Sequence, residues 1–64
     1  MEHRNVEVKL ELTPEQAEAL AQLAKRITWT DCRCNAESHD EAYLMMDAIS
    51  RVQTALAEAG YAPR

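Results

Sequence analysis

Cys32, Cys34 and His39 are the residues of this chain whose types could bind a metal ion, with Asp31 directly before the first cysteine. A structural zinc site takes four ligands, and a Cys-x-Cys pair with one His leaves the fourth to be supplied from elsewhere. In a helical segment, residues two apart also point to nearly opposite sides. We therefore predict no metal site and no other cofactor, and we interpret the two cysteines as free thiols.

The run Ser38-His39-Asp40 contains the three residue types of a hydrolase triad. Three consecutive residues at the start of a helix cannot form the required relay, because their side chains point apart. Ser38 with Glu41 three residues later is the pattern of a capping box, and Asp40 adds negative charge where the helix dipole favours it. We predict no catalytic residue and a protein that is not an enzyme.

These residues belong to the start of a long amphipathic segment, predicted to be a helix over about residues 39–59. Gly60 can adopt the left-handed conformation that ends a helix, and Tyr61 follows where such an ending places an apolar residue. At roughly 100° per residue, Asp40, Asp47 and Glu58 share one side of this helix. The opposite side carries an apolar stripe of Ala42, Met45, Ile49, Val52, Leu56 and Ala59.

The first half of the chain predicts a strand followed by a second helix. Apolar and polar residues alternate strictly over about residues 5–12, which is typical of a strand with one buried face. Thr13, Pro14 and Gln16 are a cap, a first helical residue and a capping-box partner, so a helix is expected over about residues 14–27. Residues 28–37 read as an irregular or short helical connector.

The predicted fold class is mostly α, a small α+β domain spanning residues 1–64. One N-terminal strand precedes two main antiparallel helices. A lone strand leaves backbone groups unpaired. Its partner is a second strand hidden in the connector or a copy of itself in a strand-paired homodimer; alternatively, it lies on the helices of a monomer as an extended arm.

The charge composition of the chain limits the kinds of partner that we expect. The 64 residues include eleven acidic and seven basic side chains, a formal net charge of −4. This balance disfavours general nucleic-acid binding, which needs phosphates to be neutralised, and suits a basic protein partner. We find no signal peptide or membrane span, and two cysteines without a secretory signal indicate the cytoplasm.

The stretch VEVKLELTPEQAEALAQLAKR, residues 6–26, resembles the first half of a ribbon-helix-helix repressor or antitoxin. The resemblance implies a dimer whose paired strands enter the major groove of DNA. The outward side chains would then include Glu7 and Glu11, which carry the same charge as phosphate. We therefore keep a dimeric transcriptional regulator or antitoxin as the alternative hypothesis.

The ending DEAYLMMDAISRVQTALAEAGYAPR resembles those of small accessory proteins from phages and prophages, a group that includes the anti-CRISPR inhibitors. The resemblance implies a non-enzymatic inhibitor in the cytoplasm of a bacterial host. Its carboxylates would mimic DNA phosphates on the basic DNA-binding surface of a CRISPR effector subunit. Trp29 is interpreted as either a lid on the core or an exposed anchor for the partner. The expected partner-binding residues are Asp40, Asp47, Glu58, Glu37, Asp31, Tyr43, Trp29, Glu7 and Glu11.

Overall fold

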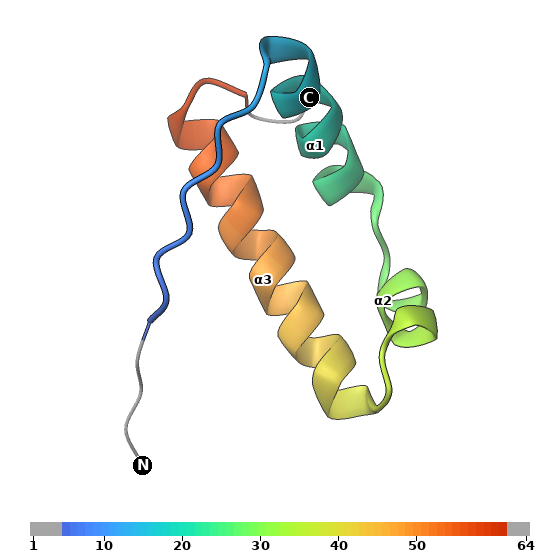
Figure 1. The fold of residues 1–64 in the computed structure, drawn as a ribbon. Helices are drawn as coiled ribbons and strands as arrows, with labels where there is room; N and C mark the ends of the chain where they lie inside the picture. The colour runs from blue at the N-terminus through green and yellow to red at the C-terminus, as the bar shows by residue number, and fades with distance from the viewer. Residues whose placement is uncertain (1–4, 62–64) are drawn as a thin grey trace.

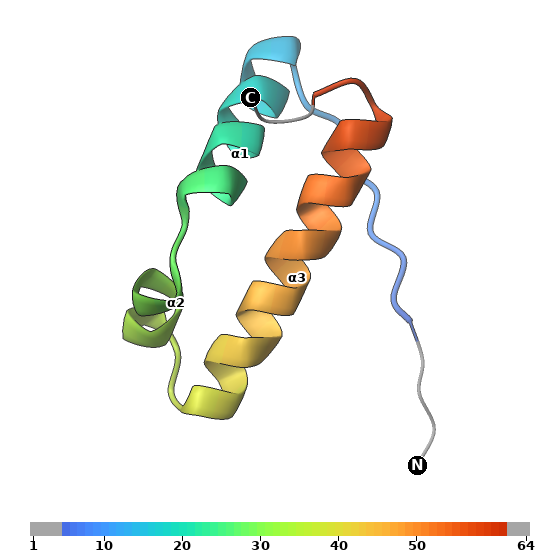
Figure 2. The same cartoon turned by 180° about the vertical axis from the view of Figure 1, so that it is seen from behind.

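A computed structural model describes residues 5–61, which form three helices. They are α1 (Pro14–Arg26), α2 (Trp29–Asn35) and α3 (His39–Glu58). Figure 1 shows α3 running between the other parts: α1 and α2 lie along one side of it, and residues 5–13 run along the other. The view from behind in Figure 2 shows the same order. The molecule is flat, with extents of 34 × 29 × 16 Å.

The expected N-terminal strand is wrong, and with it the α+β class. Residues 5–13 are extended but form neither helix nor strand, and no β-strand occurs anywhere in residues 5–61. The alternation of apolar and polar residues shows only which side chains a strand would bury if a strand formed. A strand also needs a second backbone to bond with, and this part of the chain offers none. We call residues 5–13 the arm.

Side-chain caps start each of the three helices. Thr13 Oγ1 accepts from Gln16 N–H at 3.1 Å, and Gln16 Oε1 accepts from Thr13 N–H at 3.0 Å, which completes the capping box of α1. In the connector, Thr28 and Asp31 form a second capping box. This box starts α2, so residues 29–35 of the expected connector are a regular helix.

The ends of α3 are also set by local sequence. Ser38 Oγ accepts from Glu41 N–H at 3.1 Å, but the Glu41 carboxylate accepts from Glu37 N–H instead of completing a box with Ser38. At the other end Gly60 has φ of 95°. Tyr61 N–H donates to Leu56 C=O at 2.8 Å and Gly60 N–H donates to Ala57 C=O at 3.0 Å, the two bonds of a Schellman motif.

The core between α1 and α3 is small and rich in alanine. Ala17, Ala21 and Leu56 form its buried cluster, and Leu20, Val52 and Tyr61 pack against it in part. Alanine side chains let the two antiparallel helices approach closely, but each buries little area. A hydrogen bond adds to this contact between α1 and α3: the side-chain amide of Gln53 donates to Ala24 C=O at 2.9 Å.

The second contact joins α2 to the first half of α3. Cys32 and Ala42 are buried there, and Cys32 Sγ–H donates to Met46 Sδ at 3.4 Å. Each of the shorter helices therefore packs on its own part of α3. Within the described part of the chain, no helix combines the length and the apolar character needed to cross a membrane.

Candidate functional site

Three aromatic rings meet on the surface where α2 and α3 begin. Trp29 stacks on His39 with ring centroids 6.1 Å apart and planes 4° from parallel. Tyr43 lies on the same indole at 4.5 Å, tilted by 39°. Trp29 is half-buried, whereas His39 is exposed and Tyr43 is 62% exposed. We call these three residues the aromatic cluster.

Capping determines where each ring lies. The Thr28–Asp31 box starts α2 at Trp29, so the indole extends from the first helical position. Ser38 likewise starts α3 at His39, and Tyr43 follows four residues later on the same side of that helix. The connection of residues 36–38 then turns the chain from the end of α2 into α3, which brings both α3 rings against the indole at the start of α2. Sequence reasoning missed His39 as a member of this cluster, because its neighbours suggested metal or triad chemistry.

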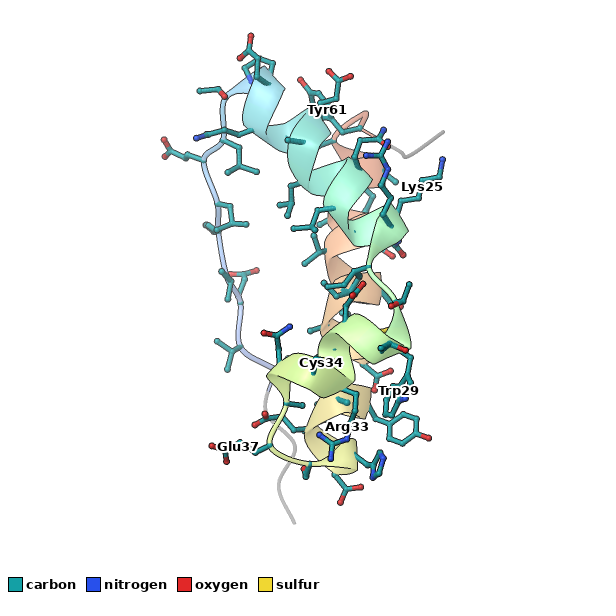
Figure 3. The ribbon with its side chains drawn as sticks, turned by 90° about the vertical axis from the view of Figure 1, so that its right-hand side faces the viewer. Lys25, Trp29, Arg33, Cys34, Glu37 and Tyr61 are labelled. Atoms are coloured by element: carbon teal, nitrogen blue, oxygen red, sulfur yellow. The ribbon has the colours of Figure 1, made fainter. Side chains whose placement is uncertain are left out.

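Two of the expected acidic residues flank the aromatic cluster. Asp40 and Asp47 are exposed and lie three residues before and four residues after Tyr43, so all three share one side of α3. We call Asp40, Tyr43 and Asp47 the acidic–aromatic face. Glu58 continues the same side but lies eleven residues beyond Asp47, about 16 Å along the helix. Figure 3 shows Trp29 on the side of the molecule away from the arm.

Other expected contact residues lie elsewhere. Glu7 and Glu11 are exposed on the arm, across α3 from α2 (Figure 1). Glu37 is exposed in the turn before α3, where its N–H donates to Glu41 at 2.9 Å. The structure therefore brings Trp29 and Tyr43 together but does not gather all the carboxylates on one surface.

Asp31 has a structural role in α2. Its Oδ2 accepts from Thr28 N–H at 2.9 Å and from Thr28 Oγ1–H at 3.0 Å, and Thr28 Oγ1 accepts from Asp31 N–H at 3.2 Å. The hydrogen bonds from the Thr28 backbone and hydroxyl stabilise the ionised carboxylate, so the pKa of Asp31 lies below its ordinary value. Asn35 adds a bond to Asp31 C=O at 2.8 Å.

The two thiols differ in environment. Cys32 is buried beside Met46, and Cys34 is exposed on the same helix. Among residues 5–61, no group of three or more His, Cys, Asp and Glu side chains is arranged to hold a metal ion.

A second surface feature, which sequence reasoning did not identify, is an apolar groove between the arm and the helices. Its volume is about 720 Å³. The even-numbered apolar residues of the arm line one wall, and Leu20, Val52 and Leu56 line the other. The sequence feature that indicates this groove is the alternation of apolar and polar residues in the arm, which we interpreted as a strand with one buried face. We call this space the groove.

The comparisons with known proteins identify the family. The chain belongs to the Family of unknown function (DUF7706), whose model matches residues 1–64. No curated protein and no solved structure matches it.

Proposed function

We propose that this member of the DUF7706 family is a non-enzymatic inhibitor that binds a basic surface of another protein through its acidic–aromatic face. The observation that carries the proposal is Tyr43, which is 62% exposed yet rests against Trp29 at 4.5 Å. An exposed aromatic ring that is already held in place loses little conformational freedom on binding, and Tyr and Trp are favoured at binding hot spots.

Charge selects the kind of partner. Asp40 and Asp47 flank Tyr43, and the chain has a formal net charge of −4. Carboxylates complement Lys and Arg side chains and accelerate encounter with a basic surface. A Lys or Arg of the partner can also lie over the Tyr43 ring in a cation–π contact. These features support a partner whose surface normally binds nucleic acid.

A CRISPR effector subunit in the bacterial cytoplasm is the most concrete such partner. Its target-binding channel holds nucleic acid through Lys and Arg side chains. In this proposal Asp40 and Asp47 occupy positions of DNA phosphates, and Tyr43 contributes the apolar contact between them. The inhibitor then competes with target DNA for the same surface.

The test is affinity capture from bacterial lysate with the tagged protein and two charge-reversal variants. Asp40→Lys/Asp47→Lys changes the acidic–aromatic face. Glu15→Lys/Glu18→Lys changes exposed carboxylates of α1. Both variants bring the formal net charge from −4 to zero, since each substitution adds two units. Both also place one lysine at the second residue of a helix, so the two variants are matched for the helix dipole.

The proposal is supported if the wild type and Glu15→Lys/Glu18→Lys both recover a CRISPR effector subunit. Asp40→Lys/Asp47→Lys should recover at least about tenfold less of it. Purified effector should then bind target DNA less well in the presence of the protein. Equal recovery by both variants would remove this face from consideration. Recovery of a toxin, or of operator DNA, would put the regulator or antitoxin hypothesis in its place.

A further inference from the structure

The arm keeps most of its apolar side chains in contact with solvent. Val6, Val8 and Leu10 are 83%, 71% and 63% exposed, although all three line the groove. The groove's volume of about 720 Å³ is several times the roughly 150 Å³ of a cavity that holds one benzene. The chain's own side chains therefore leave this space unfilled.

The backbone of the arm before Thr13 is also unpaired among the described residues. The N–H and C=O groups of residues 6–12 form no hydrogen bond with another described residue. An extended segment with one apolar side and free backbone groups is a template for a second extended segment. The arm thus presents two unmet requirements, apolar contact on one side and backbone partners along its edge.

We propose that a second copy of this chain covers the groove, with the arms of the two copies side by side and antiparallel. The apolar side chains of both arms then share one side and fill the space between the arms and the helices. The backbone groups of each arm bond with those of the other. This assembly uses the arm and the groove, not the acidic–aromatic face, so it stands independently of the proposed function.

The charges of the arm select the register. Glu7, Lys9 and Glu11 alternate in sign on the polar side. If the two-fold axis passes at Lys9, Lys9 faces its own copy and Glu7 faces Glu11, which places like charges opposite each other. If the axis passes at Val8, each Lys9 faces Glu7 of the other copy. If it passes at Leu10, each Lys9 faces Glu11 of the other copy.

Opposite charges directly across a pair of strands stabilise it, and like charges destabilise it. The registers with the axis at Val8 and at Leu10 are therefore both favourable, and the register between them is not. Neither favourable register needs any charge beyond those of this chain. This self-complementarity is the reason to assign the surface to a second copy.

The experiment is sedimentation equilibrium of the full chain over a wide concentration range. The wild type should have twice its mass of 7.2 kDa. Lys9→Glu places two pairs of like charges across either favourable register, so its dissociation constant should rise by about tenfold or more. Lys25→Glu on α1 is the matched control, with the same charge change on another exposed side chain, and should leave the dissociation constant unchanged.

Two charge swaps identify the axis. Glu7→Lys/Lys9→Glu should restore the dimer if the axis is at Val8, and Lys9→Glu/Glu11→Lys should restore it if the axis is at Leu10. Far-UV circular dichroism of each variant should show unchanged helix content, because the arm contributes no helix. A wild type that stays monomeric, a Lys25→Glu effect equal to that of Lys9→Glu, or a failure of both swaps would each overturn the proposal.

Discussion

The two halves of α3 are covered in different ways. Its first half packs on α2, where Ala42 and Cys32 are buried and Trp29 lies across the rings of α3. Its second half packs on α1 through alanines and Leu56, and leaves the groove open beside them. A close helix contact built from alanine therefore does not by itself complete a core. The larger apolar side chains of the arm remain outside it.

The largest effect is expected from Leu56→Ala, which removes the one large side chain buried in the core cluster. The lost burial and the cavity left behind should lower the free energy of unfolding by about 2–5 kcal/mol. For a domain of this size that is a large part of the total stability. Urea unfolding followed by far-UV circular dichroism measures it.

Leu44→Ala is the matched control for this prediction, because Leu44 is an exposed leucine of the same helix. Its free energy of unfolding should stay within about 0.5 kcal/mol of the wild-type value at low protein concentration. Similar losses for both leucines would show that the second half of α3 has no core of the kind described.

A smaller effect is expected where the first half of α3 packs on α2. Trp29→Ala, Tyr43→Ala and the double variant form a mutant cycle across the 4.5 Å ring contact. The coupling energy should be about 0.5–1.5 kcal/mol, the usual range for aromatic pairs. The control cycle pairs Trp29→Ala with Tyr61→Ala at the other end of the molecule (Figure 3), where the losses should add. Additive losses in the first cycle would mean that the rings do not stabilise each other.

The smallest effect concerns the cap of α2. The pKa of Asp31 is lowered in the folded protein, so its ionised form stabilises the fold at pH values above the ordinary Asp pKa of about 3.9. This contribution is lost as the pH falls through the lower pKa of the folded state. Asp31→Asn should therefore be less stable than the wild type at neutral pH and should approach it in acid. Thermal unfolding between about pH 2 and 7 tests this.

Thr28→Ala should weaken the same pH dependence, because it deletes the hydroxyl that bonds the Asp31 carboxylate and leaves the backbone N–H of residue 28 as its donor. Wild-type and Asp31→Asn curves that stay parallel across the whole pH range would show that the cap contributes nothing to the titration.

Helix ends were the part of the fold that local sequence encodes most directly. Thr13, Ser38 and Gly60 act within one turn of their own position, so their roles follow from short patterns. Thr28 and Asp31 carry the same kind of signal, but the prediction left residues 28–37 as either irregular or a short helix, because seven residues are too few to show apolar periodicity.

The strand and the aromatic cluster show why the rest could not be predicted. Alternation over residues 5–12 describes one segment, whereas a strand is a property of two. Trp29 and Tyr43 come from different helices and meet through the turn between them. The apolar pattern within a segment does not reveal which segments meet. α1 shows the same limit, because its large Leu23 side chain is exposed and its small Ala21 side chain is buried.

The turn of residues 36–38 keeps the loop between Trp29 and Tyr43 short. Loop length determines how much chain entropy is lost when a contact forms. Trp29 and Tyr43 are fourteen residues apart, whereas Ala17 and Leu56 are thirty-nine apart. Closing the longer loop requires about 1 kcal/mol more. The short helix therefore docks against α3 as a nearly local hairpin, while α1 must be recruited from a distance. The shorter of the two helices that pack on α3 is therefore the one that docks with the smaller loss of chain entropy.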